Sequence, residues 1–222
     1  MLRSPLVRTL LVAALMAVPA AARSQTCLGN PSFSTNHLQL SADASFPATA
    51  TAFGASIGSG SETVFGRVGI GGVTYDNSDG STLVIGGTVG YQVTSPTTRR
   101  FQICPVLSAA YGMGPKDFAG SGNDLRTTAF SFGLSAGGEF VRMDGFSIIP
   151  AASVGFAYWS SSVDAFGGAF STSDTYGLAG VTLGIVLNSQ LSVRPSVSLP
   201  FGVDERDPVY GIGVTLNYGG RR

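Results

Sequence analysis

The chain has 222 residues, a formal net charge of zero and only 12% charged residues, while 44% are hydrophobic and 31 are glycine. Soluble domains ordinarily carry about 25% charged residues, so this balance is unusual for a protein that faces water on all sides. The neutral charge also argues against a nucleic-acid partner. The length suits one folded unit that follows a targeting segment.

Residues 1–22 have the pattern of a secretory signal peptide. Two arginines give a positive start, an apolar run occupies residues 10–18, and three alanines at 20–22 supply the small residues of a cleavage site. The run is too short to span a bilayer. We therefore expect an exported protein with a short periplasmic segment, 23–36, ahead of the folded part, 37–222.

Apolar residues alternate with polar or small ones throughout 37–222, which is the period of a β-strand. In the last segment every second residue from Tyr210 to Tyr218 is apolar, and the residues between are glycine, threonine and asparagine. The pattern predicts an all-β chain of ten strands, or eight if two weak N-terminal strands are misread. The ten expected strands are 37–46, 49–58, 63–75, 81–94, 101–112, 126–141, 146–159, 175–187, 190–202 and 208–218.

The connections between these strands differ in length between the two ends of the sheet. The two longest, 113–125 and 160–174, fall at one end, and the short ones fall mainly at the other, as in bacterial barrels with periplasmic turns and outer loops. This predicts an antiparallel up-and-down transmembrane β-barrel. The expected outer loops are acidic, with Asp76, Asp79, Asp117, Asp124, Asp164, Asp174, Asp204, Glu205 and Asp207.

A soluble β-sandwich would also alternate, but its outer faces would carry many charges. Here the polar face is mostly glycine, serine, threonine, asparagine and glutamine, which suits a wet lumen better than bulk solvent. Aromatic residues near the expected strand ends fit the girdles of a membrane barrel. These aromatic residues are Tyr75, Tyr91, Tyr111, Tyr158, Trp159, Tyr210 and Tyr218.

With a signal peptide, glycine-rich alternating strands and an aromatic residue at the end of its last strand, the mature chain resembles the small outer-membrane β-barrel proteins that share the OmpA-like barrel domain. The resemblance implies a bacterial outer-membrane location and use of Tyr210, Leu216 and Tyr218 as the signal for the barrel-assembly machinery. Unlike the family, this chain continues beyond that aromatic residue, with Gly219 to Arg222. We also expect contact with outer-membrane lipids and lipopolysaccharide, and a monomer.

Strand parity places four charged residues inside the barrel: Asp43, Arg67, Glu139 and Arg194. Isolated charges in a lumen are costly, so we expect them to pair across it, with water between them. The alternative is a ring that selects small polar solutes.

Cys27 and Cys104 are the only cysteines, and export places them in an oxidising compartment. Cys104 lies near the periplasmic start of a strand, and Cys27 lies in the segment that should dock there. We expect a disulfide that holds segment 23–36 across the lower opening. No spacing of residues resembles a metal or haem site, so no cofactor is expected.

The only histidine, His37, lies at the periplasmic end, away from the outer rim where a barrel enzyme would place its catalytic group. We therefore expect no enzyme. The first functional hypothesis is a structural or surface-interaction barrel whose loops contact lipopolysaccharide or other cells. The alternative is a narrow channel for small polar or apolar solutes, since an inner face of glycine, serine and alanine leaves space.

Overall fold

The computed structural model describes residues 26–30, 38–60, 63–76, 80–93, 102–115, 125–143, 145–165, 168–187, 190–202 and 207–218. The expected signal peptide, His37 and most of segment 23–36 lie outside these residues. Within them, no helix is long and apolar enough to cross a membrane.

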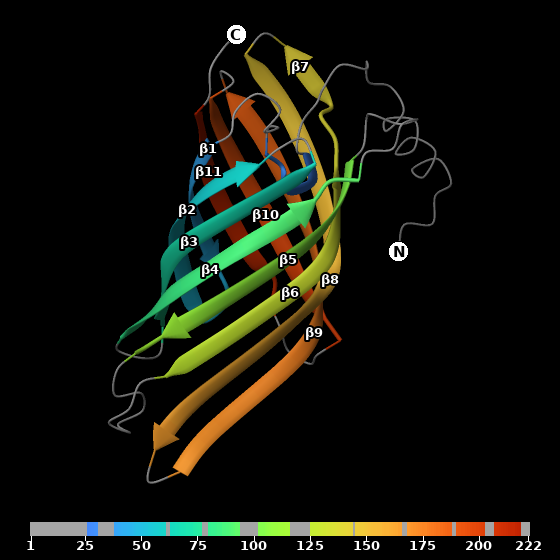
Figure 1. The fold of residues 1–222 in the computed structure, drawn as a ribbon. Coiled ribbons are helices and arrows are strands. Elements are labelled where there is room, and N and C mark those ends of the chain that lie inside the picture. The colour runs from blue at the N-terminus through green and yellow to red at the C-terminus, as the bar shows by residue number, and fades with distance from the viewer. Residues whose placement is uncertain are drawn as a thin grey trace.

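The described chain forms one antiparallel sheet whose consecutive strands are neighbours. The strands are β1 (Leu38–Phe46), β2 (Ala50–Gly60), β3 (Val64–Tyr75), β4 (Ser81–Tyr91), β5 (Gln102–Met113), β6 (Arg126–Gly137), β7 (Val141–Met143), β8 (Phe146–Ala165), β9 (Gly168–Leu187), β10 (Leu191–Phe201) and β11 (Val209–Tyr218). β1 pairs with β11, and β6 pairs with β8, so ten strands of this part of the chain close into a barrel (Figure 1). The ten-strand up-and-down prediction is confirmed.

The large apolar side chains point outward. In β3, Val68 and Ile70 are 61% and 56% exposed, and in β8, Phe156 is 65% exposed. The same outer face carries Phe53, Ile57, Leu83, Ile85, Val89, Ile103, Leu107, Phe130, Phe132, Leu134, Val154, Val181, Leu199, Ile212, Val214 and Leu216. Inside, the buried apolar cluster of the described chain consists of Cys27, Phe65 and Cys104, with Leu28 and Val106 packed against it.

The hairpin of β8 and β9 corrects the sequence prediction. Residues 160–174 were expected to be an outer loop, but both strands continue through them, paired up to Ala165 and Gly168. β10 pairs with β9 only as far as Gly177, and β6 pairs with β8 only as far as Ser162. The hairpin therefore extends past the other strands (Figure 1). Serine, threonine and aspartate dominate this extension, so it shows no apolar alternation that could distinguish a strand from a loop.

The expected strand 126–141 is interrupted by a β-bulge. Gly137 pairs with Ala151 and Val141 pairs with Ile148, so three residues on one side face two on the other. β7, beyond the bulge, pairs with β8 and lies outside the ring of ten. Glu139 lies within this interruption, where alternation no longer fixes which face a side chain occupies.

The aromatic residues divide between the two faces. Tyr91, Tyr111, Tyr158, Tyr210 and Tyr218 are exposed on the outer face, as a girdle requires. The girdle prediction is wrong for two others. The Tyr75 hydroxyl lies 3.3 Å from Oγ1 of buried Thr82, and Trp159 pairs with Ala129, which lines the lumen, so both belong to the inner face.

Candidate functional site: the barrel lumen

The barrel has two ends, which we name by their connections. The turn end holds the connections at 61–63 and 188–190, and the loop end holds those at 114–125 and 203–208. Between them, a cavity of about 670 Å³ occupies the lumen and is lined by residues from all ten strands of the ring.

Small side chains create this cavity. Where large residues would fill the interior of a barrel of this size, the inner faces of the strands carry glycine, alanine and serine. The cavity-lining residues of this kind include Ser45, Ala52, Gly54, Ser56, Gly69, Gly71, Gly86, Ser108, Ala110, Ala129, Ser131, Ala157, Ser196, Gly211 and Gly213. The predicted space is therefore present.

Asp43 and Arg194 form an ion pair on the inner wall. Nη2 of Arg194 donates a hydrogen bond of 2.8 Å to Oδ1 of Asp43. The two residues are on β1 and β10, and both pair with Gly213 of the intervening strand β11, so the bridge passes over that glycine. A Cβ at position 213 would lie 2.3 Å from Asp43 Oδ1 and 2.9 Å from Arg194 Nη2. A side chain at position 213 would therefore displace one or both of the charged groups from their present positions.

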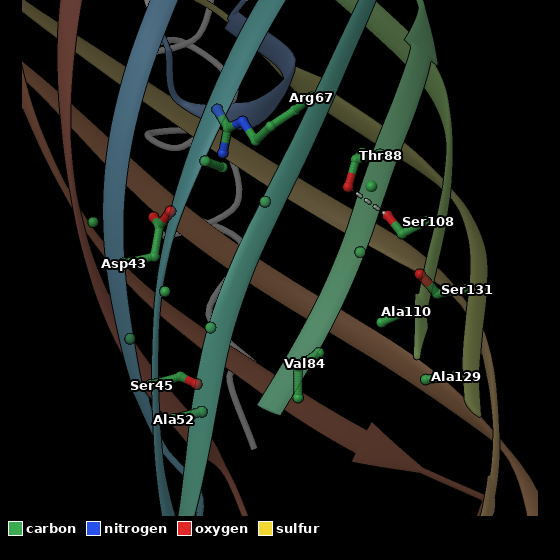
Figure 2. Close-up of a pocket in the computed structure, with 18 of the residues that line it drawn as sticks. Asp43, Ser45, Ala52, Arg67, Val84, Thr88, Ser108, Ala110, Ala129 and Ser131 are labelled. Carbon is green, nitrogen blue, oxygen red and sulfur yellow. Dashed lines mark hydrogen bonds between the residues drawn. The ribbon is translucent and has the colours of Figure 1, made fainter. Parts of the chain in front are cut away.

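Arg67 of β3 lines the same cavity and reaches across it toward β1 and β2. Figure 2 shows its guanidinium and the carboxylate of Asp43 turned toward one another. Arg67 has no hydrogen bond or ion pair within 4 Å to another described residue. Among the described cavity-lining residues, Arg67 and Arg194 are the cations and Asp43 is the anion, which leaves a net charge of about +1.

Glu139, the fourth charge predicted for the lumen, lies at the β6–β7 bulge and is not among the residues that line the cavity. Its placement inside the barrel stays a prediction. The pairing of Asp43 with Arg194 was expected only in general terms, because sequence parity does not specify the register that aligns both residues with Gly213.

The N-terminal segment enters the lumen at the turn end. A short 3-10 turn, Thr26–Leu28, places Cys27 against β5, where it forms the predicted disulfide with Cys104. Both cysteines are at most 1% exposed and pack on Phe65 of β3. The Ser135 hydroxyl of β6 donates a hydrogen bond to the Cys27 carbonyl. We call residues 26–30 the plug.

The plug fits closely against the opposite wall. A Cβ added at Gly184 of β9 would lie 2.1 Å from the Gly29 carbonyl oxygen, so a side chain there would displace the plug. Between the plug and Arg67 the free space is about 10 Å³, which is about the minimum that holds one water molecule. In the described residues the plug is therefore packed closely against the turn-end wall on the side of β3 and β9, and the wide part of the lumen lies beyond Arg67.

The lining of the cavity is polar near Arg67 and partly apolar toward the loop end. Arg67, Thr88 and Ser108 lie toward the plug, and Thr88 and Ser108 share a hydrogen bond of 2.9 Å (Figure 2). Toward the loop end, apolar side chains line the cavity beside polar ones such as Ser45 and Tyr176. The apolar residues are Ala52, Val73, Val84, Ala110, Ala129 and Leu178.

Among the described residues, no group of three or more histidine, cysteine, aspartate or glutamate side chains could hold a metal ion. Tyr210, Leu216 and Tyr218 lie on the outer face of β11, which pairs with β1 and β10. Their role as an assembly signal stays a prediction.

Together, the closed ring of strands and its apolar outer face define a transmembrane β-barrel. Within the ring of ten, each strand pairs with a neighbour on both sides, so the backbone forms its hydrogen bonds internally, which is what a strand-built membrane protein requires. An apolar surface of this extent would be unstable in water but is stable against lipid.

Comparison with known proteins adds distant structural similarities. No family model matches the chain, and no curated protein matches it. The N-terminal β-barrel domain of Pseudomonas aeruginosa OprF is 14% identical, with a TM-score of 0.38 over 83% of this chain and 98% of that one. Ail, the attachment invasion locus protein of Yersinia pestis, is 12% identical, with a TM-score of 0.40 over 82% and 99%. Neisserial surface protein A is 15% identical, with a TM-score of 0.36 over 83% and 99%. All three are small outer-membrane β-barrels.

Proposed function

We propose that the protein is a non-catalytic barrel of the bacterial outer membrane with a structural or surface-interaction role, and that its lumen is closed to solute flow. The observation that carries this proposal is the plug. A disulfide holds it in place, and the space between it and Arg67 is about 10 Å³. We expect the plug to block ion flow, because it contacts β3, β5, β6 and β9 around the turn end of the lumen.

The β8–β9 hairpin supports the surface role. It extends beyond the rim at the loop end, and the exposed side chains of its outer part include Phe170 and a run of hydroxyl residues, Ser171 to Ser173. β9 has β8 as its only described neighbour over residues 168–176. The hairpin thus presents polar and aromatic groups away from the lipid-facing belt, where another molecule can reach them.

Single-channel conductance of the mature protein in planar bilayers tests the closed lumen. With the disulfide intact we expect insertion without steady conductance. The matched control is the Cys27→Ser, Cys104→Ser double variant, whose plug is no longer tethered. Steady channels through the disulfide-bonded protein would overturn the closed lumen and favour the alternative, a narrow channel, which the wide cavity of about 670 Å³ otherwise supports.

An epitope inserted at 166–167, the tip of the hairpin, tests the orientation. On intact cells we expect an antibody to label this variant, because the short turns and the plug belong on the periplasmic side. The matched control carries the same epitope at 188–189, in a turn at the opposite end, and should be labelled only after permeabilisation. Labelling of the control on intact cells would reverse the orientation and remove the surface role.

A further inference from the structure

The cavity contains hydrogen-bonding groups that the described chain leaves open. Arg67 has no hydrogen bond or close ion pair with another described residue. Nε of Arg194 and Oγ of Ser56, both buried, also lack a partner there. Arg194 itself is only 8% exposed, and its contact with Asp43 uses Nη2. Polar groups in such positions ordinarily bind water or a ligand.

The open groups are mostly donors with positive charge. Guanidinium groups present N–H donors in a planar arrangement that matches the oxygen atoms of carboxylate, sulfate or phosphate. Asp43 balances one of the two arginines, so the site has one positive charge in excess. This favours an occupant with a single negative charge over a neutral or multiply charged one.

The rest of the cavity favours a ligand that has an apolar part. From the arginines toward the loop end the lining gains alanine, valine and leucine side chains, including Val84, Ala110 and Leu178. The volume of about 670 Å³ lies within the range of roughly 300–1,000 Å³ that is usual for small-molecule sites. A molecule with an anionic head and a short apolar chain would match both parts.

We infer that the lumen binds a small amphiphilic anion, with its head group at Arg67 and Arg194 and its apolar part among the inward side chains of Val84, Ala110 and Leu178. The wide part of the lumen lies on the loop-end side of Arg67 and the plug lies on the other side, so we place the entrance of the site at the loop end. This inference rests on the cavity and stands whether or not the plug can open.

The chain carries a built-in reporter for this site. Trp159 is the only tryptophan and pairs with Ala129 of β6, a residue that lines the cavity. Its fluorescence should therefore change when a ligand displaces water from the loop-end half of the lumen. Acidic residues of the loops would slow the entry of an anion, so we choose equilibrium binding as the readout.

The test is titration of the refolded full mature barrel with hexanoate, followed by Trp159 fluorescence and calorimetry, with hexanol and inorganic sulfate as matched probes. Hexanoate should bind more tightly than either, because hexanol lacks the charge and sulfate lacks the apolar chain. Arg67→Gln should weaken hexanoate binding by about tenfold, and Arg67→Lys by less. Arg126→Gln, at an exposed position outside the cavity, should change nothing.

Ala110→Leu provides a second, independent test, since it narrows the apolar half and leaves the arginines unchanged. It should weaken hexanoate binding and leave sulfate binding unaltered. Heat-modifiable migration on gels checks that each variant is folded. Absence of hexanoate binding, equal binding of hexanol, or unchanged binding by both Arg67→Gln and Ala110→Leu would overturn the inference.

Discussion

The two halves of the lumen share the same ten strands and differ in how they are filled. At the turn end, residues 26–30 insert between the walls, and the pocket between them and Arg67 has a volume of only about 10 Å³. Toward the loop end, no described segment enters, and about 670 Å³ stays open. Small residues are frequent on the inner faces of both halves. The comparison shows that the strands of the barrel leave space in the lumen, and that the disulfide-bound N-terminal segment occupies this space at the turn end only.

The largest expected effect comes from breaking the tether of the packed half. Cys27→Ser should lower the free energy of unfolding by about 4 kcal/mol, because the disulfide closes a loop between residues 77 positions apart. Urea unfolding of the barrel in lipid vesicles measures this. The reduced wild-type protein and the Cys27→Ser, Cys104→Ser variant should match the single variant. Equal stability with and without the bond would show that the plug contributes nothing to the fold.

The charged pair at the border between the halves should have the next largest effect. Asp43→Asn leaves Arg194 buried without its counter-charge and should cost about 1–3 kcal/mol. Arg194→Met alone should cost less, and the double variant should cost less than the sum of the two. The same urea titrations measure all three. Strict additivity would mean that the pair observed here is not formed in the membrane.

A smaller effect on the free energy of unfolding is expected from a substitution of Gly213, which lies beneath that pair. Gly213→Ala would place a Cβ 2.3 Å from Asp43 Oδ1 and separate the carboxylate from Arg194. We expect a loss of about 1 kcal/mol, measured as above, and a smaller loss when Asp43 is already asparagine, because no ion pair is then left to separate. Gly66→Ala is the matched control, since the nearest atom to a Cβ there is 3.9 Å away. An equal loss at both positions would assign the effect to the strand backbone rather than to the ion pair.

The smallest effect is expected on the projecting hairpin, which packs on neither half of the lumen. Phe170 is 60% exposed, so Phe170→Ser should change the free energy of unfolding by no more than about 0.5 kcal/mol. The unfolding midpoint of the folded barrel measures this. A large destabilisation would show that the hairpin packs against the barrel or the lipid.

The sequence predicted the outer face of the barrel better than its interior. Val68, Ile70 and Phe156 alternate with small residues, and a period of two in a two-faced sheet fixes which side each one occupies. The Cys27–Cys104 bond was predictable because only two cysteines are present, and because Cys104 lies near the start of a strand at the end where the N-terminal segment with Cys27 should dock. These features depend on local pattern and composition.

The alternation of apolar and polar residues did not predict the structure in two places where the sheet does not impose a regular apolar face. The hydroxyl-rich residues 160–174 lie beyond the apolar belt, so neither face of these strands needs to be apolar. Their sequence therefore lacks the alternation that would have identified them as strands. At Glu139 a bulge adds one residue, and a single extra residue reverses the parity of everything that follows.

By itself, the sequence determined an all-β chain with an apolar outer face, a small and polar inner face, and a pair of cysteines able to anchor the N-terminal segment. Only the tertiary structure decided that Asp43 meets Arg194 across Gly213, that Arg67 is left without a close ion-pair partner among the described residues, and that the plug fills one half of the lumen. The reason is register. The face of the sheet on which a side chain lies follows from the alternation of residues along the chain. Which side chains meet across a closed barrel depends on how the ten strands are staggered around the ring.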